Sequence, residues 1–185
     1  MRPQKVDDEL VMEKMIPLFR AQGYDGTSMQ DLAEATGLKK ASLYHRFPGG
    51  KEDMALSVMA YAGIKVKKTI IEHLLNKQLE PQVRLNKALE GIKNFYDGGK
   101  ASCLLRALSS GSPLPMINEK LEIGMSRWIE AFKILGLDYG FSDDEASHKA
   151  TQSLVLVQGS LVVGRTLNST KPFLDALLAI REMYK

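Results

Sequence analysis

Apolar residues recur along this chain at three- and four-residue intervals, the period of an α-helix with one face against a core. No alternating apolar and polar run of useful length indicates a β-strand. Capping residues and helix breakers divide the pattern into about nine helices. They are expected at residues 7–22, 27–37, 40–47, 51–79, 81–96, 101–110, 116–135, 142–168 and 172–184. The pattern therefore predicts an all-α protein.

The first predicted helix contains a local conflict at Pro17. Acidic residues at its start suit the helix dipole, and Gly23 is a natural stop. Pro17 removes one backbone donor and crowds the preceding turn. We expect either a kink at Pro17 or a helix that starts later than the acidic residues suggest.

The second predicted helix opens at Thr27 and Ser28, which allow two overlapping capping boxes, one with Gln30 and one with Asp31. Gly37 is suited to the left-handed end of this helix. One buried face is expected from residues at helical spacing, namely Met29, Leu32, Ala33 and Thr36.

A third short helix follows and is broken by the glycine and proline residues at 48–50. Two short helices joined through Gly37 are typical of a helix-turn-helix, whose second helix enters the major groove of DNA. Residues 39–47 are the predicted recognition helix. Leu43 and Phe47 should pack inward, and the outward positions are Lys40, Ser42, Tyr44 and His45.

Charge supports this interpretation locally. The whole chain of 185 residues has a formal net charge of only +3, which does not by itself indicate nucleic-acid binding. Residues 39–51 contain four basic and no acidic residues, whereas residues 1–38 contain four basic and seven acidic ones. A merely solvated basic surface is the alternative. The caps, the Gly37 turn and the break at residues 48–50 favour the interpretation that this segment binds DNA.

The cysteine count and the apolar stretches indicate the cellular compartment. The single cysteine, Cys103, cannot form an intrachain disulfide, and this favours a reducing compartment. The first residues have no apolar core of the kind that a signal peptide needs. Residues 154–164 form the longest apolar-looking stretch, which is far too short to cross a membrane. A soluble, cytoplasmic protein without membrane contact is expected.

The N-terminal third resembles the TetR family of transcriptional regulators. The resemblance lies in residues 18–33 and 37–47 and continues through 51–54 into the next helix. The loop at residues 47–51, Phe-Pro-Gly-Gly-Lys, is one residue longer than the commoner form and is similar to the subgroup that includes regulators of multidrug-export genes. Pro17 departs from the usual helix-forming residue.

The resemblance implies a helix-turn-helix domain at residues 1–50 and a helical ligand-binding and dimerisation domain at 51–185. It further implies that Thr27 caps the second helix and touches a phosphate, and that Lys51 meets a phosphate. The full implied DNA-binding set is Thr27, Ser28, Lys39, Lys40, Ser42, Tyr44, His45 and Lys51. The partner would be a palindromic double-stranded operator.

The resemblance also implies a homodimer built from the last two long helices. Two recognition helices are needed to read two half-sites one turn of DNA apart. Small residues in the helix at 142–168 allow close approach of another helix, although both helices could instead bury these faces within one subunit. The expected interface residues are Leu154, Gly159, Leu161, Gly164, Phe173 and Leu177.

A ligand chamber is the second implied feature of this domain. Methionine and aromatic side chains suit an apolar effector, although the same stripe is also typical of plain core. The expected lining is Phe95, Cys103, Leu104, Arg106, Met116, Met125, Trp128, Phe132 and Gln158. An effector bound there would shift the helix at residues 51–79, which follows the helix-turn-helix. This shift would release the operator, so the protein would act as a repressor.

A small helical enzyme and an adaptor without operator binding are the alternatives. Glu145 and His148 have the Glu-x-x-His spacing of di-iron bundles, but the second such pair that those sites need is missing. No activating partner of Cys103 and no phosphate-binding loop is visible. We therefore expect no catalytic residue, metal or cofactor. Activation instead of repression also remains open.

Overall fold

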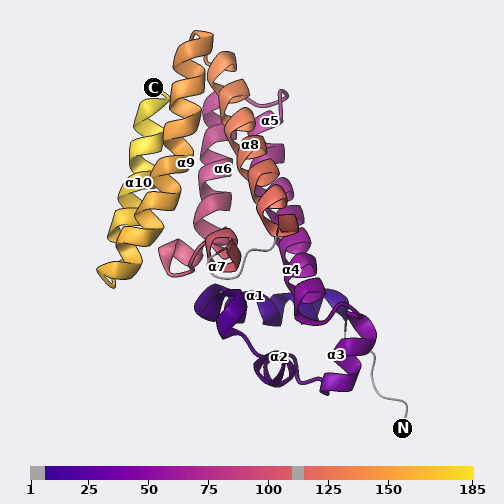
Figure 1. Ribbon diagram of the computed structural model, residues 1–185. Coiled ribbons are helices and arrows are strands. Elements are labelled where there is room, and N and C mark those ends of the chain that lie inside the picture. Colours follow the sequence, from indigo (N-terminus) through magenta and orange to yellow (C-terminus); the bar gives the residue numbers. More distant parts are fainter. Residues whose placement is uncertain (1–6, 110–114) are drawn as a thin grey trace. The chain divides into compact units, whose positions relative to one another are not determined.

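The computed structural model describes residues 7–109 and 115–185, with the backbone alone at 115 and 116 (Figure 1). The helices up to residue 95 are α1 (Asp8–Gly26), α2 (Met29–Thr36), α3 (Lys40–Arg46), α4 (Gly50–Val66), the π-helical turn η1 (Lys67–Ile71), α5 (Glu72–Leu75) and α6 (Pro81–Phe95). The 3₁₀ turn η2 (Asp97–Gly99) precedes α7 (Leu104–Ser109), α8 (Pro115–Asp138), α9 (Asp143–Thr166) and α10 (Lys171–Met183). With α4, η1 and α5 counted as one rod, nine helices and no strand occupy these residues, as predicted.

The chain forms two compact units. The first draws on described residues within 1–62 and 104–118, and the second on those within 63–103 and 119–185. α4 and α8 therefore contribute residues to both units. The predicted functional division after residue 50 falls at the start of α4 and stays a prediction, because compactness does not report which residues touch DNA.

The break in α1 lies at Gly23 and not at Pro17. Asp7 caps the helix by accepting from the Glu9 N–H at 3.2 Å, so the helix also starts where the acidic residues suggest. Inside α1 only Gly23 leaves the helical conformation, at φ 72° and ψ −174°. A side chain there would also meet the carbonyl oxygen of Ala107 in α7 at 2.9 Å. The expected kink at Pro17 is wrong, because backbone strain and close packing select the glycine.

The rod of α4, η1 and α5 ends at Leu75, four residues earlier than predicted, and contains a π-helical turn that the pattern did not predict. Gly91 of α6 packs directly on this turn. A Cβ atom at residue 91 would lie only 2.0 Å from the carbonyl oxygen of Thr69. Two backbones therefore touch here, which only a glycine permits.

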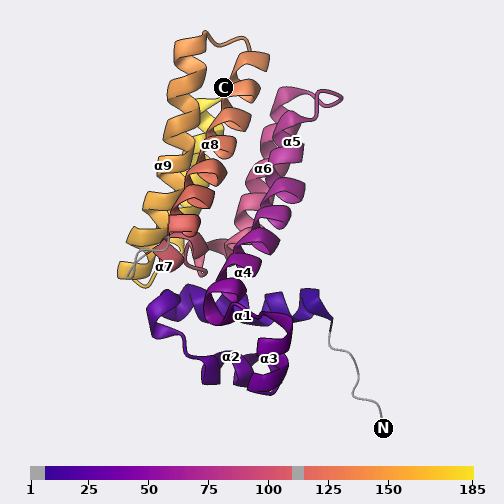
Figure 2. The same ribbon diagram turned by 45° about the vertical axis from the view of Figure 1, so that its right-hand side comes forward.

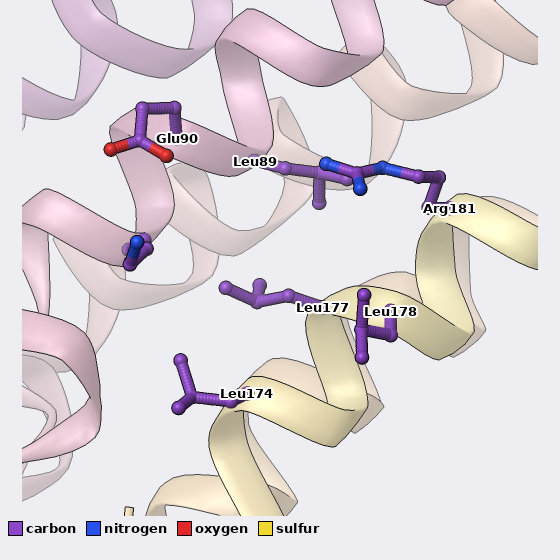
Figure 3. A pocket seen from close by; sticks show the side chains of 7 residues that line it. Leu89, Glu90, Leu174, Leu177, Leu178 and Arg181 are labelled. Carbon is purple, nitrogen blue, oxygen red and sulfur yellow. The ribbon is translucent and has the colours of Figure 1, made fainter.

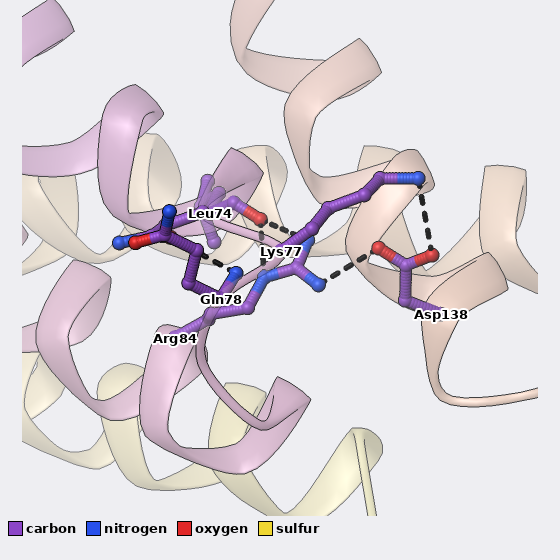
Figure 4. Close-up of polar contacts among 6 residues, drawn as sticks. Leu74, Lys77, Gln78, Arg84 and Asp138 are labelled. Carbon is purple, nitrogen blue, oxygen red and sulfur yellow. Dashed lines mark hydrogen bonds and ion pairs between the residues drawn. The ribbon is translucent and has the colours of Figure 1, made fainter.

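A buried arginine joins three helical segments of the second unit (Figure 4). Arg84 of α6 is 2% exposed, and its Nε donates to the Leu74 carbonyl at 2.8 Å. The Nη2 atom donates to the same oxygen, while Nη1 donates to the Asp138 carboxylate at 2.7 Å. Lys77 lies 3.6 Å from Asp138 at the surface. Asp138 still belongs to α8, which extends three residues beyond the predicted end at 135.

The helices α9 and α10 lie side by side and run antiparallel (Figures 1 and 2). Their shared core includes Tyr184, whose ring lies 6.1 Å from that of Phe132 in α8. The predicted break at residues 97–99 is confirmed as η2, where Gly99 has φ 98°. A side chain at residue 99 would meet the Phe173 Cβ at 2.8 Å, so this turn packs against α10.

Candidate DNA interface

The turn between α2 and α3 has the predicted chemistry. Gly37 ends α2 in the left-handed conformation at φ 70° and ψ 18°. Its N–H donates to the Glu34 carbonyl at 3.2 Å, and the next N–H, from Leu38, donates to Ala33 at 3.1 Å. These bonds satisfy carbonyl groups that a helix end otherwise leaves open. The chain therefore turns sharply into α3, as a helix-turn-helix requires.

The cap of α2 is Ser28 and not Thr27. The Ser28 hydroxyl accepts from the Asp31 N–H at 3.1 Å, and the Asp31 carboxylate accepts from the Ser28 N–H at 2.8 Å. The Ser28 hydroxyl, and then its N–H, hold the pKa of Asp31 below its ordinary value. Thr27 is 1% exposed and donates its hydroxyl to the Gly23 carbonyl at 2.6 Å. The capping role expected of Thr27 is wrong, because burial commits its hydroxyl to α1.

Two anchors hold α3 in place. Leu43 and Phe47 are buried, as predicted. Arg46 donates to Asp8 of α1 at 2.7 Å, so the last turn of α3 is also tied to the start of α1. This ion pair was not predicted, since residues 8 and 46 are distant in sequence. A helix held on one side in this way presents its other side in a fixed orientation.

The outward side of α3 carries the predicted residues. Tyr44 is 50% exposed. The other exposed positions are Lys39, Lys40, Ser42 and His45. Lys39 occupies the cap position of α3, where its side chain makes no cap bond. The exposed face therefore combines cations, a hydroxyl, a phenol and an imidazole, groups that donate to phosphate oxygens and base edges. Contact of these residues with DNA stays a prediction.

The loop after α3 places Lys51 against α1. Gly50 has φ 67°, and a Cβ there would approach the Tyr44 ring at 3.4 Å. The Lys51 Nζ donates to the Tyr24 carbonyl at 2.9 Å and lies 4.4 Å from the centre of the Tyr24 ring. An ammonium group has three donors, so two remain for a phosphate. The structure thus gives Lys51 a positioning contact that sequence reasoning missed.

The predicted chamber residues fall into small groups. Trp128 and Phe132 stack with ring centres 6.4 Å apart in α8. Phe95 packs edge-on against Tyr96 at 5.1 Å, and Gln158 Nε2 donates to the Tyr96 hydroxyl at 3.1 Å. Tyr96, which the pattern did not single out, therefore links two predicted residues. Cys103 and Leu104 are buried, Met125 is half-buried and Arg106 is exposed, while Met116 lies outside the described side chains.

Trp128 is the most informative of these residues. It is 5% exposed, and its indole N–H has no hydrogen-bond partner among the described residues. A buried donor without an acceptor is costly and is rare in native proteins. The donor is therefore available to a bound molecule with an acceptor.

The predicted dimer residues lie mostly inside the second unit. Buried positions are Leu154, Leu161, Gly164, Phe173 and Leu177. Gly159 is exposed, and a Cβ there would meet no atom of the described chain within 4 Å. The fold of one subunit therefore needs no glycine at 159. Exposed valines flank it on α9, at 155, 162 and 163.

The Glu145–His148 pair lies in the first turns of α9. Glu145 belongs to the capping box of α9, where its carboxylate accepts from the Ser142 N–H at 3.0 Å and from the Ser142 hydroxyl at 2.7 Å. His148 is exposed. Among the described residues no group of three or more His, Cys, Asp or Glu is arranged to hold a metal ion. Within the same ranges, no helix has the length and apolar character to cross a membrane.

Comparison with known proteins agrees with this arrangement. The family model described as bacterial regulatory proteins, TetR family, matches residues 16–58. The HTH-type transcriptional regulator YxaF of Bacillus subtilis is 24% identical over 170 residues, which cover 90% of this chain and 88% of YxaF.

Solved structures show the same fold. A TetR transcriptional regulator from Legionella pneumophila matches with a TM-score of 0.84 at 22% identity, and all of both chains is covered. The TetR-family regulator CifR, in complex with 26-base-pair operator DNA, matches with a TM-score of 0.77 at 18% identity over 100% of this chain and 98% of that one. Residues 16–58 therefore match the TetR family of bacterial regulatory proteins, and the chain as a whole has the fold of solved TetR-family regulators.

Proposed function

We propose that this protein is a transcriptional repressor that binds a palindromic operator as a homodimer and leaves it when a small, largely apolar effector binds. The exposed polar face of α3, held by Leu43, Phe47 and the Arg46–Asp8 pair, is the observation that carries the proposal. CifR, whose fold is similar, has been solved on operator DNA. Bound across a promoter, such a dimer would block transcription.

Residues of α3 have two roles in this proposal. Lys39, Lys40 and Ser42 hold phosphates at the helix start, and Lys51 and Ser28 add contacts from neighbouring elements. These contacts set the register of the protein on DNA without reading sequence. Tyr44 and His45 reach base edges or phosphate. Thr27 supports the interface through α1, because its hydroxyl is already bonded there.

The DNA test uses the double variant Tyr44→Ala, His45→Ala and the intergenic DNA upstream of the gene. Loss of two contacts should weaken binding about tenfold or more, measured by fluorescence anisotropy. His148→Ala, an exposed histidine on α9, is the matched control and should bind as wild type does. Undiminished affinity of a folded double variant would overturn the assignment and favour an adaptor without operator binding.

Lysine contacts have their own signature. Replacing Lys39 or Lys40 with methionine should weaken binding for all DNA sequences alike. Each should also reduce the salt-dependence slope by about one. A change in base preference without a change in slope would assign the lysines to base edges instead.

We infer that the dimer face lies on the exposed stripe of α9. Val155, Gly159 and Val162 recur at intervals of four and three residues and point away from the buried face. The open space at Gly159 allows a partner helix to approach closely. Leu154, Leu161, Gly164, Phe173 and Leu177 then support this face from beneath.

Val162→Lys tests the dimer. It should give a monomer in sedimentation velocity and lose operator affinity, since two half-sites must be read together. Val83→Lys is a matched control on α6, where the native valine is also exposed. A dimer that survives Val162→Lys would place the interface elsewhere.

We infer that the effector contacts Trp128. Its unpaired indole N–H supports a ligand with an apolar body and one acceptor. Coupling between effector and operator is expected at about 1–3 kcal/mol. Trp128 is the single tryptophan of the chain, so its fluorescence reports binding directly. Compounds that shift this emission without weakening operator binding would contradict the switch.

A regulator of this kind acts on DNA in the cytoplasm and performs no catalysis. In support, one oxygen of the Glu145 carboxylate accepts two hydrogen bonds from Ser142, so Glu145 has a structural role in the cap of α9. Stoichiometric metal in an elemental assay of the purified protein would revive the enzyme alternative.

A further inference from the structure

A groove of about 220 Å³ lies between α6 and α10 in the second unit (Figure 3). None of the described side chains expected in the effector chamber lines it. Its lining comes from Leu89, Glu90 and Lys93 on α6 and from four residues of α10. The groove therefore needs an explanation of its own.

The groove has an apolar base and an open rim. Leu89, at 3% exposed, and Leu177, at 8%, form the base. Leu174 and Leu178 stand at the rim and are 38% and 56% exposed. Four leucine side chains on two helices make a surface suited to an aliphatic chain.

Cationic groups border the leucines. Lys93 and Arg181 carry positive charge, against one negative charge on Glu90. Figure 3 shows Arg181 extending from α10 toward Leu89 of α6. The groove thus pairs an apolar base with a net positive edge.

Arg181 also has an unused donor. Its Nε is buried, and among the described residues no acceptor bonds to it. A buried guanidinium N–H without an acceptor is costly, and carboxylates are the acceptors that match its planar fork. An anion that reaches Arg181 from the groove would supply this acceptor.

We propose that this groove binds the anion of an aliphatic carboxylic acid of medium length. The carboxylate accepts from Arg181, Lys93 adds attraction, and the chain lies on the leucines. At roughly 30 Å³ for each non-hydrogen atom, the volume holds about seven such atoms. Octanoate, with about ten such atoms, fills this volume, and about three of its atoms extend past the open rim. The site is a second ligand site, separate from the proposed function.

Octanoate is the probe, titrated into the full chain by calorimetry and followed by ¹H–¹⁵N spectra. Arg181→Met should lower octanoate affinity about tenfold or more, because a charge-assisted bond is lost while the volume is kept. Lys93→Met should lower it by roughly threefold, as expected for an exposed charge. Lys87→Met is the matched control, since Lys87 is also exposed on α6 but lies outside the groove.

Two compounds with the same aliphatic chain test whether the groove selects a negative charge. Octanol lacks the charge and octylamine reverses it, so both should bind more weakly than octanoate. Arg181→Lys keeps the charge but removes Nε, and should recover only part of the lost affinity. Spectral shifts should centre on α6 and α10.

Several results would overturn the proposal. They are absence of octanoate binding to folded wild type, equal binding of octylamine, and unchanged affinity in Arg181→Met. If Arg181→Met weakens self-association and leaves octanoate affinity intact, the acceptor for Nε comes from a second copy of the chain, and the ligand site is wrong. Operator binding by the same variants is measured in parallel and should stay at the wild-type level.

Discussion

The helices α2 and α9 begin with the same reciprocal cap, although α2 has 8 residues and α9 has 24. Ser28 with Asp31 closes the first, and Ser142 with Glu145 closes the second. In α2 the cap, the Gly37 turn and three buried residues hold the whole element. In α9 the same cap is one small contribution beside a long buried face. Equal local chemistry therefore has unequal consequences, because the surrounding packing differs.

The comparison extends to the functional surfaces. Around α3 the important groups are exposed and belong to one short stretch of sequence. In the second unit the important contacts are made by backbones and buried charges that are distant in sequence. The first region should respond mainly in DNA binding when it is altered, and the second mainly in stability.

The strongest test of the packed region is Gly91→Ala. Its Cβ would enter the Thr69 carbonyl, so we expect a loss of at least about 3 kcal/mol in the free energy of unfolding. Gly124→Ala on α8 is the control, since a Cβ there meets no described atom within 4 Å. That variant should gain about 0.5–1 kcal/mol from helix propensity. Urea unfolding followed by circular dichroism measures both, and similar midpoints would show that the π-helical turn yields easily.

Asp138→Asn tests the buried charge. It leaves the Arg84 guanidinium without its carboxylate, and we expect a loss of about 2–3 kcal/mol, because Asp138 is partly exposed. Lys77→Met removes the exposed partner of the same carboxylate and should cost no more than about 0.5 kcal/mol. Equal losses in urea would mean that solvent screens Arg84 despite its burial.

The free energy of unfolding at high pH tests the burial of Tyr184 in the aromatic core. Burial, as the largest cause, raises the pKa of Tyr184 from 10.0 to about 12. The folded state thus holds this proton more tightly, and the stability is present below pH 10 and lost as the pH rises toward 12. At pH 11 the loss is on the order of 1 kcal/mol. Tyr184→Phe should show a flatter decline between pH 9 and 11, and parallel curves for the two proteins would contradict this assignment.

The paired caps give the smallest but most direct comparison. Ser28→Ala and Ser142→Ala each remove one cap and should each cost about 1 kcal/mol. Only Ser28→Ala should also weaken operator binding, because α2 supports α3 and Ser28 itself is one of the proposed DNA contacts. Thermal unfolding and anisotropy on the same samples separate the two effects. Equal losses of DNA affinity in the two variants would contradict the proposed difference between the α2–α3 region and the second unit.

Local sequence signals predicted the helix-turn-helix of α2 and α3 well. Gly37 at the end of α2 and the inward positions of Leu43 and Phe47 follow from spacing and turn chemistry alone. The choice between Thr27 and Ser28 did not follow, because both fit a capping box and only the packing of Thr27 against α1 decides. The Arg46–Asp8 pair was also hidden, since it joins residues 38 positions apart.

The second unit was predicted less completely. Helix positions and the break at residues 97–99 were found, but the π-helical turn on Gly91 and the Arg84–Asp138 pair were not. Leu154, Phe173 and Leu177 show the reason most clearly. Their apolar character is visible in the sequence, but whether a leucine faces its own core or a partner depends on neighbours from other helices.

The sequence by itself determined the all-helical architecture, the turn at Gly37 and the basic segment at residues 39–51, which has no acidic residue, because each depends on residues within a few positions of one another. Tertiary structure decided which hydroxyl caps α2 and where α1 breaks. It also decided that the donors of Trp128 and Arg181 have no acceptor among the described residues. It also formed the groove between α6 and α10. These features depend on close approach between distant segments, and hydrophobic periodicity contains no information about which segments meet.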